Sequence, residues 1–260
     1  MTRQWLVGDV RAYARVRLFC FPHAGGGGSF FLPWSAALAP RIAVCPVVLP
    51  GREGRIREPA YDRMAPLLDA LIAGLLPYTD QDFAIFGHSM GSVVGYEFAR
   101  RLQHEHGRRA RCLLVSGRRA PQLPARRAPL HTLPDQDFTE GLRGLNGTPA
   151  DVLEDEGLLR LFLPSLRADF AVNETYVASG GPSLSCPVSA LTGTADPEVT
   201  VEEMAQWRSV TEDDFRLRVF YGDHFYLKSR PDDVLDAIRQ DLNEYPTRLQ
   251  RTTPQPAATR

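Results

Sequence analysis

The stretch that most constrains the fold of this chain is Gly87-His88-Ser89-Met90-Gly91, which follows an apolar run and precedes a helix-compatible one. A G-x-S-x-G pattern between a strand and a helix predicts a sharp turn that holds its serine in a strained backbone conformation. Gly87 and Gly91 fit this turn because side chains at their positions would collide across it. We therefore expect the Ser89 hydroxyl to be exposed beside the positive end of a helix dipole. Because five residues can match by chance, an ordinary glycine-rich turn is the alternative.

Short apolar runs alternate with helix-compatible segments on both sides of this turn. The expected strands are residues 16–21, 42–49, 83–86, 112–116, 188–191 and 215–221, and the expected helices are 30–38, 61–76, 90–104, 201–207 and 231–242. The alternation predicts an α/β fold with a mostly parallel, doubly wound sheet. Continuous apolar runs are typical of strands that are covered on both faces.

One long segment, residues 118–185, breaks this alternation, because it contains two helical patterns and no convincing strand. We interpret it as a helical lid inserted into the sheet domain; a packing subdomain that does not move is the alternative. The tail is rich in proline and threonine, which is typical of disorder. The predicted division is a lead-in at 1–15, a core at 16–117 and 186–245, the lid at 118–185 and a disordered tail at 246–260.

Bulk properties exclude several classes of protein. The chain has 260 residues and a formal net charge of -1, which gives no indication of nucleic-acid binding. Its four cysteines show neither C-x-x-C nor a metal-ligand spacing, and they fit free thiols in a reducing compartment. No apolar run approaches the roughly 20 residues that span a membrane, and the beginning lacks the apolar core of a signal peptide. We expect a soluble, cytoplasmic protein without metal.

A nucleophilic serine needs a base, and His224 is the best of the six histidines. It follows the last expected strand, at the carboxyl edge where open α/β sheets place their sites. It also completes the chain order serine, acid, histidine. His23, in a glycine-rich loop after the first strand, is the main rival.

An acid must orient that base, and Asp196 follows the strand before the last one. Capping of the next helix before Pro197 is its alternative role. Asp223 is the direct neighbour of His224 and could hardly turn back to it. Asp169 falls in the expected lid.

Two hydrogen-bond donors should face the developing oxyanion. The backbone N–H of Met90 is one, since it opens the helix after Ser89. The loop Pro22-His23-Ala24-Gly25-Gly26 should supply the other, and we expect the backbone N–H of Ala24. A phosphate-binding role for this loop is weaker, because it contains neither phosphate-binding glycine motif.

Together these features resemble an α/β-hydrolase, and six segments narrow the resemblance to the standalone, type II thioesterases of polyketide and nonribosomal peptide pathways. It runs from about residue 15 to residue 243. The segments are Phe21-Pro22-His23-Ala24-Gly25-Gly26, Pro50-Gly51-Arg52, Gly87-His88-Ser89-Met90-Gly91, Ser116-Gly117-Arg118-Arg119-Ala120-Pro121, Leu166-Arg167-Ala168-Asp169-Phe170 and Gly222-Asp223-His224-Phe225-Tyr226.

The resemblance implies a serine thioesterase that removes stalled or aberrant acyl groups from the phosphopantetheine arm of acyl or peptidyl carrier proteins. The family's triad maps onto Ser89, Asp196 and His224, and its oxyanion donors map onto Met90 and Ala24. Such chemistry needs no cofactor. A carboxylesterase, lipase or acyltransferase on the same triad is an alternative, and a non-catalytic binding scaffold is another.

Two further expectations concern the substrate. Carrier proteins are typically acidic, so arginines could form a docking patch, although a solvated face is the more ordinary role for them. The candidates are Arg118, Arg119, Arg126 and Arg127 in one loop and Arg52, Arg55 and Arg57 in another. Phe225, Tyr226, Phe162 and Phe170 could line an acyl chamber or pack in the core.

Nothing in the sequence demands a dimer, and we expect a monomer.

Overall fold

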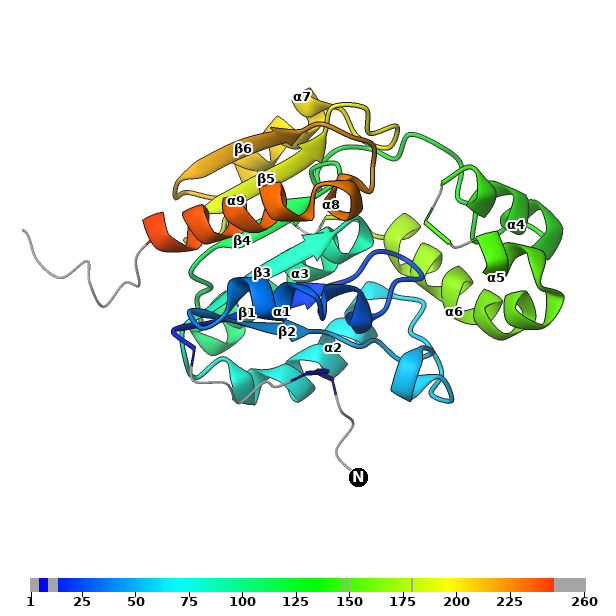
Figure 1. Cartoon of the computed structure of the whole chain (residues 1–260), viewed down its shortest axis with the longest axis horizontal. Helices are drawn as coiled ribbons and strands as arrows, with labels where there is room; N and C mark the ends of the chain where they lie inside the picture. Colours follow the sequence, from blue (N-terminus) through cyan, green and yellow to red (C-terminus); the bar gives the residue numbers. More distant parts are fainter. Residues whose placement is uncertain (1–4, 9–13, 146, 149, 179, 246–260) are drawn as a thin grey trace, which may run out of the picture.

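The computed structural model describes residues 5–8, 14–145, 147–148, 150–178 and 180–245. Its centre is a parallel six-stranded sheet with helices on both faces (Figure 1), as the alternating pattern predicts. The strands are β1 (Val16–Phe21), β2 (Ile42–Pro46), β3 (Phe83–His88), β4 (Leu113–Ser116), β5 (Val188–Gly193) and β6 (Phe215–Phe220). The order across the sheet is β2-β1-β3-β4-β5-β6.

Most helices lie where the sequence predicts them. They are α1 (Trp34–Leu38), α2 (Met64–Leu75), α3 (Met90–His106), α4 (Asp135–Arg143), α5 (Ala150–Glu154), α6 (Glu156–Glu174), α7 (Val201–Ala205), α8 (Tyr226–Ser229) and α9 (Pro231–Glu244). The predicted helix at 30–38 is instead a 3-10 turn, Gly28–Phe31, followed by α1, with Pro33 at the break. Proline cannot donate the hydrogen bond that would continue the first helix into the second. The short helix α8 was not predicted.

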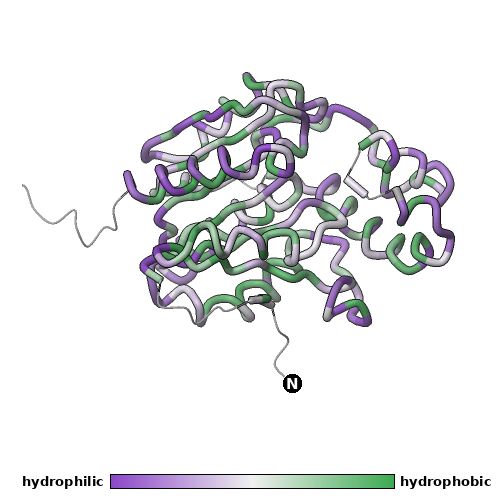
Figure 2. The backbone as a smooth tube through the Cα atoms, viewed as in Figure 1, coloured by the Kyte–Doolittle hydropathy of each residue, from purple (hydrophilic) through white to green (hydrophobic). Residues whose placement is uncertain are grey.

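Apolar clusters cover both faces of the sheet. Neighbouring residues of a strand point to opposite faces, so Ile85 joins the cluster under α2, α3 and α7, and Phe86 joins the cluster under α1, α8 and α9. Phe98 and Trp34 are buried in these two clusters respectively. The strands inside are correspondingly apolar along most of their length (Figure 2).

The order of the strands places a topological switch point between β1 and β3. From β1 the chain goes outward to β2 and then returns to β3 on the other side of β1, so the connections after β1 and β3 run in opposite directions. The register pairs Phe21 with Gly87 and His88 with Ser116, so these strands end at one level. The glycine-rich loop and the Ser89 turn therefore meet at this edge.

Helices α4, α5 and α6 lie together beyond the carboxyl ends of the strands, at the right of Figure 1. They share an apolar cluster of their own, which includes Phe138, Leu166 and Phe170. Asp155 caps the N-terminus of α6, where its side chain accepts the N–H of Leu158, and Pro164 lies inside that helix without ending it.

Part of the expected lead-in is packed against the core. Trp5 and Leu6 are buried, and Leu6 forms a bridge to Val47. The predicted disordered tail at 246–260 lies outside the described residues. In the described part of the chain no helix has both the length and the apolar character to cross a membrane.

Candidate active site

Ser89 occupies the strained turn that its sequence predicts. Its φ and ψ are 53° and -119°, a conformation that residues other than glycine rarely adopt. The turn is tight on both sides: a Cβ at Gly87 would lie 2.1 Å from the carbonyl oxygen of Gly91, and a Cβ at Gly91 would lie 2.1 Å from that of Phe21. The Ser89 N–H donates to the carbonyl oxygen of Ser116 at 2.8 Å, which ties the turn to β4.

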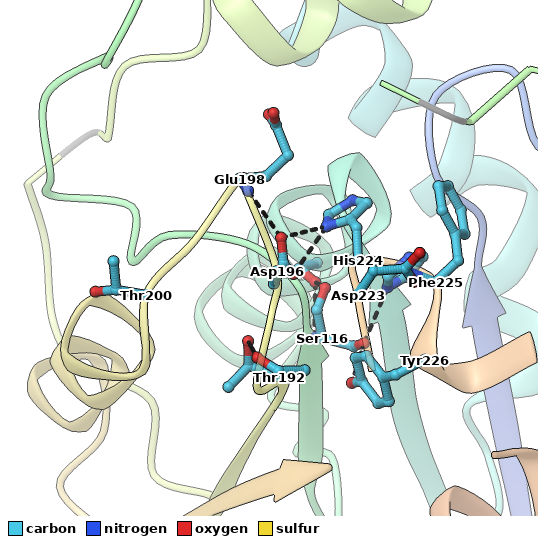
Figure 3. A network of polar contacts seen from close by, with 12 residues as sticks. Ser116, Thr192, Asp196, Glu198, Thr200, Asp223, His224, Phe225 and Tyr226 are labelled. Carbon is cyan, nitrogen blue, oxygen red and sulfur yellow. Dashed lines mark hydrogen bonds and ion pairs between the residues drawn. The ribbon is translucent and has the colours of Figure 1, made fainter. Parts of the chain in front are cut away.

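His224 and Asp196 meet at the carboxyl edge of the sheet (Figure 3). The Nδ1 atom of His224 lies 2.9 and 3.0 Å from the two carboxylate oxygens of Asp196, whose side chain is completely buried. The N–H of Glu198 donates to the same carboxylate at 2.8 Å. Capping of α7 does not need Asp196, because Thr200 caps that helix.

The His224 ring lies beside the Ser89 turn. Its centroid is 4.9 Å from that of His88, the residue before Ser89. It also lies close to Gly117, where a Cβ would be 3.1 Å from the ring. Within the described residues the Ser89 hydroxyl and His224 do not form a hydrogen bond, and such contacts commonly tighten only when substrate is bound.

The rival base, His23, has a different environment. Burial lowers the pKa of its imidazole to about 3, with the positive charge of Lys228 as a second cause. Among the described residues its Nδ1 has no hydrogen-bond partner, and the hydrogen bond of the ring is with the backbone of Gly147. Its edge packs against Phe30 and Phe225 instead. These contacts favour a neutral, packed histidine over a base.

A polar network behind the site includes residues that sequence reasoning did not find. The Nδ1 atom of His88 is 2.9 Å from the Ser116 hydroxyl, which is 2.6 Å from the Tyr226 hydroxyl. Burial, and then the nearby His224, lower the pKa of His88 well below its usual value. Of the two roles expected for Tyr226, the structure shows core packing, because its side chain is fully buried in the cluster under α1, α8 and α9. No spacing in the sequence indicates this network.

The two predicted oxyanion donors lie at the same edge. Met90 is the first residue of α3, so its N–H has no partner within the helix. Ala24 is half-buried in a turn that the Gly26 N–H closes on the carbonyl oxygen of His23 at 2.9 Å. A positive φ of 77° at Gly25 fits the third position of a type II turn.

The predicted docking arginines are largely engaged within the chain. Arg52 and Arg55 are buried, which makes their proposed docking role wrong; they pair with Asp169 and Glu58. Arg119 and Arg126 both form ion pairs with Glu203. Arg127 forms an ion pair with Glu198. Arg57 is exposed, and Arg118 follows Gly117 at the site's edge, where burial lowers the pKa of its guanidinium.

An apolar wall adjoins the site. Ala24 packs against the apolar cluster of α4 to α6. Phe162 and Leu163 are half-buried and pack against the same cluster. Phe170 packs inside this cluster, edge-on to Phe138 at 5.4 Å between ring centroids. In the described part of the chain, no group of three or more histidine, cysteine, aspartate or glutamate side chains could hold a metal ion.

The chain matches one known family and is similar to several named proteins. The chain matches the family described as "Thioesterase domain" over residues 16–242. It is 41% identical to Linear gramicidin dehydrogenase LgrE of Brevibacillus parabrevis, over 93% of this chain and 94% of that protein. It is 41% identical to Thioesterase PikA5 of Streptomyces venezuelae, over 87% of this chain and 81% of that protein. The solved structure of the type II thioesterase BorB from the borrelidin biosynthetic cluster is 40% identical, with a TM-score of 0.83, and the match covers 92% of this chain and 97% of BorB.

The chain therefore belongs to the thioesterase domain family. The predicted α/β-hydrolase fold is confirmed, because the parallel sheet and its flanking helices superpose on those of solved thioesterases. The resemblance to type II thioesterases is confirmed as well.

Proposed function

We propose that this protein is a serine thioesterase that hydrolyses acyl groups from the phosphopantetheine arm of carrier proteins. The observation that carries the proposal is the buried Asp196–His224 pair, which lies at the same sheet edge as the strained Ser89. A nucleophile, a base and an orienting acid in this chain order suffice for acyl transfer through an acyl-enzyme.

The proposed reaction has two steps. Because the Nδ1–H of His224 donates to Asp196, the Nε2 atom carries the lone pair that accepts the Ser89 proton. The Ser89 Oγ then bonds to the thioester carbonyl, and the backbone N–H groups of Met90 and Ala24 stabilise the oxyanion. Collapse of this intermediate breaks the C–S bond, and His224 gives the proton to the departing thiolate sulfur. Water, with His224 again as base, releases the acid and regenerates Ser89.

Carrier-bound substrates follow from the family and its relatives rather than from the triad. BorB comes from the borrelidin biosynthetic cluster, and the chain matches almost its whole length. The apolar wall beside Ala24 suits an acyl chain.

We place the protein in the cytoplasm as a monomer that removes stalled or aberrant acyl groups, with residues 118–185 as its lid. The buried free thiols support a reducing compartment.

Two alternatives remain distinct from this proposal. An esterase would use the same residues on an oxygen ester, and an acyltransferase would pass the acyl group to an acceptor other than water. The name of LgrE indicates a dehydrogenase. This chain, however, has no G-x-G-x-x-G motif that opens a helix after a strand, which is the usual phosphate-binding fingerprint of such enzymes.

The decisive experiment offers one acyl group as a carrier-protein thioester, as a small thioester and as an oxygen ester. Release and Ser89 acylation are followed by mass spectrometry, with Ser89→Ala as the matched control. We expect acylation at Ser89 and the highest kcat/KM with the carrier thioester. Preference for the oxygen ester would indicate an esterase, and no release from any of the three would indicate a binding scaffold.

A further inference from the structure

One buried ion pair joins three parts of the chain that meet beside the proposed oxyanion site. Asp169 lies on α6, in the helical insertion, and Arg52 lies in the connection after β2. Two guanidinium N–H groups of Arg52 donate to the two carboxylate oxygens of Asp169, at 2.6 and 2.7 Å. Both side chains are about 5% exposed or less. This two-pronged geometry fixes orientation as well as distance.

The third part is the turn that contains Ala24. The Gly25 N–H donates to the Oδ2 atom of Asp169 at 2.7 Å, and Arg52 donates to the carbonyl oxygen of Gly26 at 3.0 Å. The pair therefore holds one donor and one acceptor of the same turn, on the two residues that follow Ala24. It constrains the peptide plane between Ala24 and Gly25, which a turn can otherwise rotate between types I and II.

Helix α6 also fills the space over this turn. A Cβ at Gly25 would lie 2.4 Å from a methyl carbon of Leu166. A Cβ at Gly51 would lie 3.0 Å from the Cβ atom of Ser165. Leu166 and Asp169 are three residues apart on α6, so one helix face supplies both the packing and the carboxylate.

We propose that Asp169 and Arg52 are positioning residues for the oxyanion hole, so that the helical insertion completes the catalytic site instead of only covering it. The inference rests on the proposed function, because Ala24 matters only if an oxyanion forms. The pair touches no substrate. It acts through the Ala24 turn, and a misplaced donor lowers the rate more than the binding of substrate, since the oxyanion exists only in the transition state.

The test compares Asp169→Asn with the wild type on a small thioester. We expect kcat to fall by at least about tenfold with KM within about threefold, because loss of one oxyanion donor costs about 10²-fold or more. Glu97→Gln is the matched control: Glu97 forms a buried pair with Arg100 and accepts the Tyr176 hydroxyl after α6, yet it does not contact the turn. A fall of less than about tenfold in Asp169→Asn, or an equal fall in Glu97→Gln, would overturn the inference.

Asp169→Asn leaves the Arg52 charge buried and unpaired, which can prevent folding. The double variant Arg52→Met/Asp169→Leu avoids this, because apolar side chains of similar volume often replace a buried ion pair without loss of stability. Its melting temperature should stay near that of the wild type, while kcat falls as in the single variant. Wild-type kcat in a folded double variant would show that the pair serves stability alone.

Phosphonylation of Ser89 by a fluorophosphonate separates this inference from the proposed function. That reaction also develops charge on an oxygen in the oxyanion hole and needs no thioester. If the wild type reacts but cleaves no thioester, the proposed substrate is wrong. Slower phosphonylation of the Asp169→Asn variant would still support the positioning role, and an unchanged rate would overturn it.

Discussion

At the scale of single residues, the geometry of one imidazole governs the proposed chemistry. The two carboxylate oxygens of Asp196 both lie within 3.0 Å of Nδ1 of His224, and the carboxylate has no exposure to solvent. Water therefore cannot replace Asp196 as the acceptor. The contact fixes which nitrogen carries the proton, and Nε2 remains free to act as base.

Replacement of Asp196 by asparagine should lower kcat by about 10⁴-fold, because an amide that donates to Nδ1 stabilises the wrong tautomer. Steady-state hydrolysis of a small thioester measures the loss. Asp223→Asn is the matched control, since Asp223 adjoins His224 but accepts the N–H of Phe225. Retention of more than about a tenth of wild-type kcat in Asp196→Asn would refute the assignment of the acid.

Burial of His23 should make folding sensitive to acid. The pKa of His23 is about 3 in the folded chain and about 6.5 in an unfolded one, so between these values the unfolded state binds one more proton. The free energy of unfolding is therefore lost as the pH falls through this window, by up to about 1.4 kcal/mol per pH unit from His23. Above about pH 6.5 this dependence vanishes.

The measurement is urea unfolding at several pH values from about pH 6 down to about pH 4. His23→Gln should flatten the dependence by up to about 1.4 kcal/mol per pH unit, and His104→Gln, on the exposed end of α3, controls for the loss of an imidazole. An identical slope in His23→Gln and the wild type would show that His23 is protonated in the folded protein.

At the scale of elements, close approach of backbones holds α3 against β1. The N-terminus of α3 reaches the end of β1 at Gly91, where a Cβ would lie 2.1 Å from the Phe21 carbonyl oxygen and 2.7 Å from that of Pro22. These neighbours are backbone atoms, which cannot move aside as a side chain can. Glycine at this position therefore sets the distance between helix and sheet.

Gly91→Ala should lower the free energy of unfolding by about 3 kcal/mol or more, because the helix must move away from the sheet. Urea unfolding measures the change. Gly54→Ala is the control, since a Cβ there meets no atom within 4 Å, and it should leave stability unchanged or slightly raised. A loss below about 1 kcal/mol in Gly91→Ala would mean that the two elements separate easily.

The sequence predicts the elements better than their arrangement. Apolar runs locate the six strands of the sheet, because the apolar residues of each strand reflect which of its faces are buried. The alternating pattern at 215–221 fits an edge strand such as β6. The strand order and the short helix α8 depend on contacts between distant residues, which local patterns do not encode. Asp196 and His224 were predicted together because each follows a strand. Asp169 and Arg52 lie 117 positions apart, and no local pattern links them.

At the scale of the whole molecule, the two apolar cores leave no thiol near the surface. All four cysteines are buried and free. Burial raises the pKa of the Cys45 and Cys186 thiols to about 12, and it raises the pKa of Cys20 and Cys112 well above the usual value. The thiolate is the reactive form of cysteine. In the folded state the thiols are therefore unreactive, because reagents cannot reach them and few of them are ionised.

We therefore expect the native protein to be inert to a thiol-specific disulfide reagent at mildly alkaline pH, and to expose its four thiols together on unfolding. Absorbance of the released chromophore gives the number of thiols per chain. Ser29→Cys is the control, because Ser29 is exposed and the new thiol should react in the native state. Rapid reaction of one native thiol in the wild type would mean that part of a core opens without global unfolding.

The strained backbone of Ser89 has a consequence for the history of such chains. A serine at φ 53° and ψ -119° costs about 1–3 kcal/mol of stability relative to a residue that adopts this conformation freely. Selection for activity keeps that cost in place. In a duplicated copy released from catalysis, glycine at position 89 would be favoured for stability alone, so descendants that have become binding proteins should lose this serine before they lose the fold.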